Sequence, residues 1–251
     1  MEFAQGWDSH ATLVDGRWVE RRPRRPEVAE QLRRETRLMP WLAPRLPLPV
    51  PVPELVTDAP LVVRHALVPG AATESPTAEH GLGLARFLRA LHDTSAAEAL
   101  RHALPPAAAT RSDRAAAIER FEADVLPLIP VAQHDSALAI LHALRAAPAD
   151  TVVHGDLGPE HVLTENGRLT GVIDFGDAHL GDAANDLAWP LFGAPAEFAA
   201  AFGTAYGVTD ELRRRALLWH RLGPWYQVTY GLDIADPDVV RDGVAGVLAR
   251  L

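Results

Sequence analysis

The sequence His154-Gly-Asp-Leu-Gly-Pro-Glu-His161, followed by Ile173-Asp-Phe-Gly-Asp177, decides the fold of this chain. Asp156 stands five residues before His161, and Asp174 follows eighteen residues after Asp156, at the end of a short apolar run. This arrangement suits a phosphoryl-transfer centre, in which one carboxylate orients a hydroxyl group and two further side chains hold Mg²⁺ on a nucleotide. We therefore expect a kinase of small molecules.

Composition narrows the class of protein. A chain of 251 residues can form one bilobal unit or two small domains. It has no cysteine, which excludes disulfides and thiolate metal sites. No apolar run is long enough to span a bilayer, and the start lacks the pattern of a signal peptide. We therefore expect a cytoplasmic protein without a membrane partner.

The charge balance also carries information. The chain has 33 acidic and 24 basic residues, so its formal net charge is −9. Such a balance argues against nucleic acid as a partner and favours a cationic substrate through long-range attraction. Every basic residue is arginine, because the sequence contains no lysine. A lysine Schiff base and a P-loop are thus excluded, and nucleotide phosphates would have to be contacted by arginine.

The first part of the chain predicts strands and one helix. Residues 11–14 and 17–20 flank the turn Asp15-Gly16, a strong hairpin signal. Residues 26–42 predict a helix, and Glu35 lies on its otherwise apolar face. Burying a lone carboxylate is costly, so Glu35 should have a cationic partner.

The remaining pattern is mainly helical. Residues 71–77 are expected to form a linker and residues 105–110 a loop. Residues 1–68 then form an N-terminal lobe of strands and one helix, and residues 69–251 a helical C-terminal lobe that carries the catalytic and metal-binding loops. The further expected elements are strands at 61–68, 151–154, 162–163 and 171–174, and helices at 79–92, 112–129, 135–146 and from 182 to the end, with breaks near 193, 207 and 237.

The two motifs, with Gly181-Asp-Ala-Ala-Asn-Asp186 downstream, resemble the aminoglycoside phosphotransferase family, which shares its fold with protein kinases. The pattern is most similar to macrolide and 2″-directed aminoglycoside phosphotransferases, in which histidine often holds the position of His161. Weaker matches, including Gly6-Trp-Asp8, extend over most of the chain. The resemblance implies an α+β, bilobal protein-kinase-like fold with a small, trimmed, β-rich N-lobe and a mainly helical C-lobe.

The resemblance also implies roles for the residues of the two motifs. Asp156 would be the catalytic base, or the group that orients the attacking hydroxyl. Asp174 would bind Mg²⁺, which favours oxygen ligands. His161 would be a second metal ligand, although imidazole is a poorer match for Mg²⁺; the alternative is a hydrogen bond to Asp156 or to phosphate. His154 is expected to brace the loop.

Roles outside the motifs depend on strand register and helix ends. Arg21 is the candidate for contacting the nucleotide phosphates, with Glu35 as its ion-pair partner. Arg22 is the alternative, because neighbouring strand residues point to opposite faces. Asp182 and Asp186 are expected to cap a helix start, and Asp177 could face the substrate. The aromatic residues Trp219, Trp225, Tyr226 and Tyr230 are expected in the core.

The function implied by the resemblance is a Mg²⁺- and nucleotide-dependent O-phosphotransferase, with ATP or GTP as the donor. Its acceptor would be a hydroxyl of a small cationic antibiotic of the aminoglycoside or macrolide type. The expected partners are this acceptor and the nucleotide, and a monomer is expected rather than an obligate oligomer.

Two alternatives remain. One is a kinase of another small alcohol, such as a sugar, a choline-like compound or an amino acid. The other is a catalytically silent binding protein. The silent protein is favoured by the missing glycine-rich phosphate loop and by a small lobe that starts near the second strand of the family pattern, and it is opposed by the intact pair Asp156 and Asp174.

Overall fold

The computed structural model describes residues 9–251, so Gly6-Trp-Asp8 lies outside the described residues. One antiparallel sheet holds the strands nearest the N-terminus, in the order β1-β2-β4-β3. The predicted hairpin forms its first half, because Asp15 and Gly16 both adopt positive φ between β1 and β2. The sheet strands are β1 (Ser9–Val14), β2 (Trp18–Pro23), β3 (Glu54–Asp58) and β4 (Leu61–Ala66).

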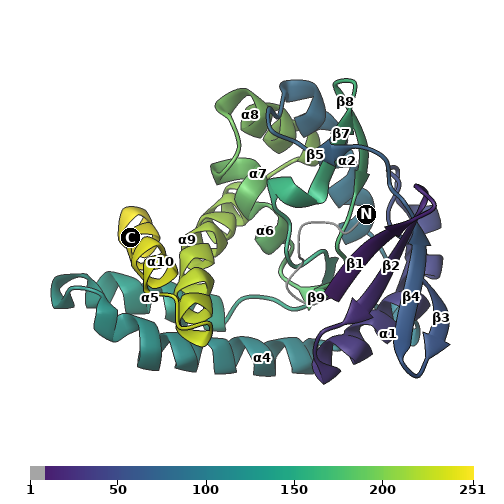
Figure 1. Cartoon of the computed structure of the whole chain (residues 1–251). Helices are drawn as coiled ribbons and strands as arrows, with labels where there is room; N and C mark the ends of the chain where they lie inside the picture. Colours follow the sequence, from purple (N-terminus) through teal and green to yellow (C-terminus); the bar gives the residue numbers. More distant parts are fainter. Residues whose placement is uncertain (1–8) are drawn as a thin grey trace.

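The helix predicted at 26–42 is present with these bounds as α1 (Pro26–Leu42), and it packs against two separate cores. Its N-terminal half packs Val28 and Leu32 against the sheet. Its C-terminal half places Met39 and Leu42 in the main core of the helical region. Figure 1 shows α1 beside the sheet. Glu35 lies between the two apolar segments, at the level where the sheet meets the helices.

The helical region contains two small sheets that carry the motifs. The hairpin of β7 (Val162–Glu165) and β8 (Arg168–Val172) turns at Asn166 and Gly167, as predicted, and β5 (Ala71–Ala72) pairs with its outer edge. A second, two-stranded sheet joins β6 (Thr151–Val153) to β9 (His179–Gly181). The sequence starting at His154 therefore begins where β6 ends.

The helices surround these sheets. In Figure 1, α4 runs along the base of the molecule from α5 toward α1, and α9 lies beside α10. The other helices are α2 (Ala78–His92), α3 (Ala96–Arg101), α4 (Ala107–Arg120), α5 (His134–Arg145), α6 (Ala183–Asp186), α7 (Ala188–Phe192), α8 (Ala196–Tyr206), α9 (Asp210–Asp233) and α10 (Pro237–Arg250). Breaks at 193, 207 and 237 agree with the prediction.

Three expectations about local structure were wrong. Residues 105–110 are not all loop, because α4 begins at Ala107; Pro106 is extended and precedes the first turn, a position that proline tolerates. The helix predicted to reach residue 129 ends earlier, in a π-turn at Phe121–Val125 and a 3₁₀ turn at Leu126–Leu128, where Pro127 lacks the N–H that a helix needs. The linker at 71–77 contains β5. The strands β3 and β9 and the helix α3 were not predicted.

The architecture is the α+β fold expected from the sequence, with an antiparallel sheet followed by a mainly helical region. Within residues 9–251, no helix is both long enough and apolar enough to cross a membrane.

Candidate active site

The five residues singled out in the sequence lie in one continuous line of charged and polar groups. Arg21 Nη1 is 2.8 Å from Glu35 Oε2, and Arg21 Nη2 is 3.8 Å from Asp174 Oδ1. His161 Nε2 is 3.8 Å from Asp174 Oδ2, and His161 Nδ1 is 4.0 Å from Asp156 Oδ2. The line starts in the N-terminal sheet and α1 and ends in the loop after β6.

The register of β2 places Arg21 and Arg22 on opposite faces of the sheet. Arg21 faces α1, where its side chain is 12% exposed, and Arg21 Nε also donates a hydrogen bond to Ser9 Oγ at 3.2 Å. Arg22 is exposed and pairs with Glu20 at 2.9 Å. The ion pair predicted between Glu35 and Arg21 is thus present, and the alternative register with Arg22 is not.

Glu35 is a buried carboxyl with too few donors. Only 3% of the residue is exposed, and its Oε1 atom has no hydrogen-bond partner. Burial raises the pKa of Glu35 from 4.5 to about 7, although the neighbouring Arg21 guanidinium opposes this shift. Glu35 therefore holds Arg21 in place while its own charge is poorly stabilised.

His154 connects the loop that carries Asp156 to the segment that carries Asp174. His154 is fully buried, and burial lowers its pKa, so we assign it as neutral. Its Nε2 donates to the Ile173 carbonyl at 2.9 Å, and its Nδ1 accepts from the Asp156 N–H at 3.3 Å. His154 thus links the backbone of Asp156 to the residue before Asp174, which agrees with the bracing role predicted for it.

His161 is oriented by the loop that it follows. Its Nδ1 donates to the Asp156 carbonyl at 2.7 Å, so in the neutral ring the lone pair is on Nε2, the nitrogen that faces Asp174. Histidines that bind metals usually donate their other N–H to a carbonyl in this way. Asp174 is half-exposed, and its φ of +66° lies in the left-handed region, which aspartate adopts more readily than most residues other than glycine. The pair therefore fits a metal ion.

Asp186 fixes the backbone on which Asp156 stands. It is fully buried and accepts hydrogen bonds from the backbone N–H groups of His154 at 2.7 Å and Gly155 at 3.0 Å. His92 Nε2 lies 3.0 Å from the same carboxylate, and His92 Nδ1 lies 2.7 Å from the Tyr206 hydroxyl. Despite complete burial, these donors lower the pKa of Asp186, since hydrogen bonds from His92 and the loop outweigh desolvation.

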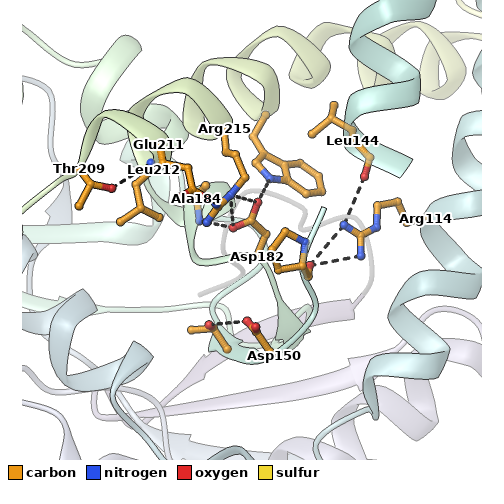
Figure 2. A network of polar contacts seen from close by, with 12 residues as sticks. Arg114, Leu144, Asp150, Asp182, Ala184, Thr209, Glu211, Leu212 and Arg215 are labelled. Atoms are coloured by element: carbon orange, nitrogen blue, oxygen red, sulfur yellow. Dashed lines mark hydrogen bonds and ion pairs between the residues drawn. The ribbon is translucent and has the colours of Figure 1, made fainter. Parts of the chain in front are cut away.

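Asp182 has the capping role predicted for it, and Asp186 does not. The Asp182 carboxylate accepts from the Ala184 N–H at the start of α6, and Arg215 and the Trp219 indole bind it from α9 (Figure 2). Asp186 is the last residue of α6, so it satisfies donors of the loop after β6 instead of donors of its own helix. The spacing of the two aspartates did not distinguish these roles.

Asp156 lines a cavity. Its side chain is 62% exposed, and partial desolvation raises its pKa against the opposing effect of His161 and His154. Because the side chain remains largely exposed, we expect a carboxylate at neutral pH. The cavity has a volume of about 740 Å³ and is bounded by α1, α4, α9 and the segment from Asp177 to Asn185.

Sequence reasoning missed part of this cavity. Trp219 and Tyr226 were expected in the core, but they line the cavity wall beside Asp156, while Trp225 is fully buried as expected. The difference follows from their positions on α9, one face of which packs against α10 while another faces α6. Asp177 also lines the cavity, and its contact with a substrate stays a prediction.

The model of the phosphotransferase enzyme family matches residues 1–218 of the sequence. The chain belongs to this family. The fold agrees: the structure of an APH(2″) aminoglycoside phosphotransferase in complex with GDP and kanamycin superimposes with a TM-score of 0.87 at 24% identity, over 100% of this chain and 92% of that one. A macrolide 2′-phosphotransferase from Brachybacterium faecium gives a TM-score of 0.75 at 24% identity, over 98% and 90% of the two chains.

Relatives of known activity match shorter parts of this family member. Viomycin phosphotransferase of Streptomyces vinaceus is 37% identical over 108 residues, which is 41% of this chain and 32% of the relative. Hygromycin-B 4-O-kinase of Escherichia coli is 46% identical over 44 residues, which is 18% of this chain and 13% of that enzyme. The matches thus span about a third of the first relative's length and less of the second.

Proposed function

We propose that this protein transfers the terminal phosphoryl group of a nucleotide to a hydroxyl of a small, amine-bearing antibiotic of the aminoglycoside or macrolide type. The observation that carries the proposal is the line from Arg21 through Asp174 and His161 to Asp156, which ends at a cavity large enough for such an acceptor. The family's antibiotic phosphotransferases, and the nucleotide complexes among its solved structures, support it.

In this proposal, Asp156 positions the acceptor and receives its proton. The acceptor hydroxyl oxygen attacks the terminal phosphorus, the bond from that phosphorus to the bridging oxygen breaks, and the nucleoside diphosphate leaves. The hydroxyl proton passes to the Asp156 carboxylate. In such a loose transition state, orientation contributes more than basicity. The bonds from Asp186 and His154 that fix the backbone around Asp156 would supply this orientation.

Asp174 and His161 would hold Mg²⁺, which when bound neutralises charge on the nucleotide phosphates. Within residues 9–251, no group of three or more acidic or histidine side chains could hold a metal ion. A Mg²⁺ ion in a nucleotide complex can be held by one or two protein side chains, because phosphate oxygens and water are its other ligands. Arg21, held by Glu35, would contact the phosphates from the other side.

The nucleotide would lie between two lobes, residues 1–68 and 69–251, because Arg21 and Glu35 belong to the first and the other candidate residues to the second. ATP and GTP are both candidate donors. All five residues belong to this chain, so the proposed site needs no residue from a second subunit. The proposed enzyme is a cytoplasmic monomer that uses a nucleoside triphosphate.

The test is an acceptor screen with Asp156→Asn and Asp174→Asn beside the unmodified protein. We expect Mg²⁺-dependent phosphorylation of at least one aminoglycoside, macrolide or related acceptor with ATP or GTP. Asp156→Asn should lower kcat by at least about 100-fold with little change in nucleotide affinity, since general-base and positioning groups contribute about 10²–10⁴-fold. Asp174→Asn should weaken Mg²⁺-dependent nucleotide binding.

Asp150→Asn is a matched control, because this exposed aspartate lies just before β6 and outside the line, and its carboxylate accepts a hydrogen bond from the Thr151 hydroxyl. Full turnover by Asp156→Asn would refute the proposed role. Absence of Mg²⁺-nucleotide binding at millimolar concentration would refute the enzyme and leave a binding protein. Phosphorylation of only sugars, choline-like compounds or amino-acid alcohols would show that the protein is instead a kinase of another small alcohol.

A further inference from the structure

The cavity beside Asp156 is mainly acidic, yet two arginines also line it. Acidic walls suit the amine-bearing acceptor proposed above, because opposite charges attract. An arginine in the same walls repels such an acceptor, unless the protein occupies the arginine or the reaction brings an anion to it. The charged residues that line the cavity are Arg34, Asp113, Arg114, Asp156, Asp177 and Asp182. Each of the two arginines therefore needs an explanation.

Arg114 is occupied by contacts within the protein. Its Nη atoms donate to the carbonyls of Leu144 and Pro148 at 3.4 Å, and its guanidinium carbon lies 5.8 Å from the centre of the Trp219 ring. Figure 2 shows the bonds that Arg114 donates. Burial lowers the pKa of Arg114, and the Asp182 carboxylate opposes this shift. Arg114 thus has partners in the fold and is not left for a ligand.

Arg34 differs, because it pairs with no carboxylate. It is partly buried on α1, and in the part of the chain that the structure describes no acidic side chain lies within ion-pair distance of it. The neighbouring arginines of the same helix are paired. Arg33 binds Asp58 at 2.8 Å, and Arg37 binds Glu30 at 3.2 Å. Of the two arginines that line the cavity, Arg34 is therefore the one that can serve a ligand.

The packing of α1 explains why Arg34 lies at this cavity. Gln31 and Arg34 are three residues apart, so they fall on the same side of the helix. Gln31 packs closely on Gly176, two residues after Asp174, since a Cβ atom on Gly176 would lie 2.2 Å from Gln31 Nε2. The same side of α1 thus contacts the segment that carries Asp174 and, through Arg34, lines the cavity that Asp156 also lines.

The proposed reaction brings an anion to this cavity. The phosphoryl group starts on the nucleotide held at Asp174 and ends on the acceptor hydroxyl beside Asp156. A loose transition state spreads negative charge over the three equatorial phosphoryl oxygens, and the product is a negatively charged phosphate ester. Carboxylates in the wall repel this charge, whereas a guanidinium binds phosphate oxygens with its fork of donors. A cation on the acceptor side therefore has a task in the transfer itself.

We propose that Arg34 is a catalytic residue that binds the phosphoryl group as it passes to the acceptor. Arg21, held by Glu35, would contact the nucleotide phosphates from the sheet, and Arg34 would contact the transferred group from the cavity. The bonds that form and break are those given above, and Arg34 keeps its proton throughout, because guanidinium stays charged in proteins. This inference rests on the proposed phosphotransferase function and adds a residue to its active site.

The first test needs no known acceptor. Calorimetry compares the affinity for Mg²⁺-ADP and Mg²⁺-GDP with and without aluminium fluoride, which mimics a phosphoryl group in transfer. For the unmodified protein, we expect aluminium fluoride to raise the affinity for at least one diphosphate at least about tenfold, since transition-state analogues bind more tightly than substrates. Arg34→Gln should remove most of this increase and leave the affinity for the diphosphate alone within twofold.

Two further variants control this measurement. Arg33→Gln removes the neighbouring arginine, which pairs with Asp58 outside the cavity, and should retain the full increase. Arg34→Lys keeps the charge and loses the fork of donors, so it should retain part of the increase. An unchanged affinity for the diphosphate alone shows that each variant is folded.

The second test measures turnover with kanamycin or another acceptor from the screen. Arg34→Gln should lower kcat by about 10- to 100-fold, since hydrogen bonds to charged groups contribute about that much. The KM for the acceptor should stay the same or fall, because the substitution removes a cation that repels amines. A merely structural role would instead raise KM or weaken diphosphate binding.

The outcomes separate the two proposals. A full aluminium fluoride effect in Arg34→Gln overturns the inference and leaves the proposed function standing. The same holds if the unmodified protein transfers phosphate but gains no affinity from aluminium fluoride. An equal loss in Arg33→Gln also overturns the inference, because it would reflect only the overall charge of α1. Absence of Mg²⁺-diphosphate binding by the unmodified protein refutes the proposed function, and the inference with it.

Discussion

Glu35 and Asp186 are both buried carboxyls, yet the protein treats them in opposite ways. Glu35 is 3% exposed and bonds only to Arg21, and its pKa rises to about 7. Asp186 is fully buried and accepts from two backbone N–H groups and from His92, and its pKa falls below the usual value. The number of donors, and not the depth of burial, decides the direction of the shift.

The difference corresponds to two kinds of task. Asp186 completes its hydrogen bonds within the helical region, so it fixes the loop of Asp156 whether or not a ligand is bound. Glu35 has an oxygen without a partner and shares Arg21 with the half-exposed Asp174. The ionised form of Glu35 is therefore only weakly stabilised. This is expected, because its cation, Arg21, would also contact the nucleotide.

Removing the carboxylate of Asp186 should have the largest effect. Asp186→Ala leaves the N–H groups of His154 and Gly155 and the His92 ring without an acceptor. Each unsatisfied buried donor costs about 1–3 kcal/mol, so we expect the free energy of unfolding to fall by about 3–5 kcal/mol. Urea denaturation measures this loss, and kcat should fall with it. A loss below about 1 kcal/mol would mean that water replaces the carboxylate.

The second-largest effect should be the dependence of the free energy of unfolding on pH. The folded pKa of Glu35 is about 7 and its usual value is 4.5, so the folded state binds the proton more tightly. The resulting stabilisation is fully present below pH 4.5 and is lost as the pH rises through 7. The shift corresponds to about 3 kcal/mol at 1.36 kcal/mol per pH unit. Urea denaturation at pH 5, 6, 7 and 8 should show this decline.

Two variants sharpen this test. Glu35→Gln should remove most of the decline between pH 5 and 8. Asp186→Asn should keep it, because the pKa of Asp186 lies below its usual 3.8 and its stabilisation is lost only as the pH falls through that lower value. An equal decline in unmodified protein and Glu35→Gln would show that Glu35 stays ionised throughout.

The sequence predicted the ion pair between Glu35 and Arg21, but it did not predict the contacts of Asp186. A carboxylate on the apolar stripe of a helix requires a cation, and the resemblance to the family pointed to Arg21, with Arg22 as the alternative register. Only strand register separated these two. Asp186 lies 94 residues from His92. No local pattern reveals such a contact, because it arises when α2 and α6 are brought to the same loop.

The cavity beside Asp156 could not be predicted from the sequence either, because segments far apart in the chain form it. Its walls come from α1, α4 and α9, and the first turn of α4 was expected to be loop. Trp219 and Tyr226 resembled core residues because aromatic side chains usually are. By contrast, the spacing within the motifs already indicated Asp156, His161 and Asp174, since these residues are brought together by loops that follow short strands.

Nucleotide binding should separate Arg21 from Arg22. Arg21→Gln removes the cation that faces Glu35 and Asp174, and hydrogen bonds to charged groups contribute about 1.5–3 kcal/mol. We therefore expect Mg²⁺-nucleotide affinity to fall by about 10- to 100-fold, as measured by calorimetry. Arg22→Gln changes an exposed partner of Glu20 and should leave affinity within twofold. Equal losses in both variants would place the phosphate contact elsewhere.

The smallest expected effect concerns the outer end of the Asp186 network. Tyr206→Phe removes one hydroxyl that bonds to His92 Nδ1 at 2.7 Å and keeps the ring that packs beside it. A single such bond contributes about 0.5–1.5 kcal/mol, so the free energy of unfolding should fall by about 1 kcal/mol. His92 keeps its bond to Asp186, so kcat should change less than threefold. A large loss of kcat at unchanged stability would mean that Tyr206 orients the loop of Asp156 through His92, and that the network extends further than the backbone donors that Asp186 binds directly.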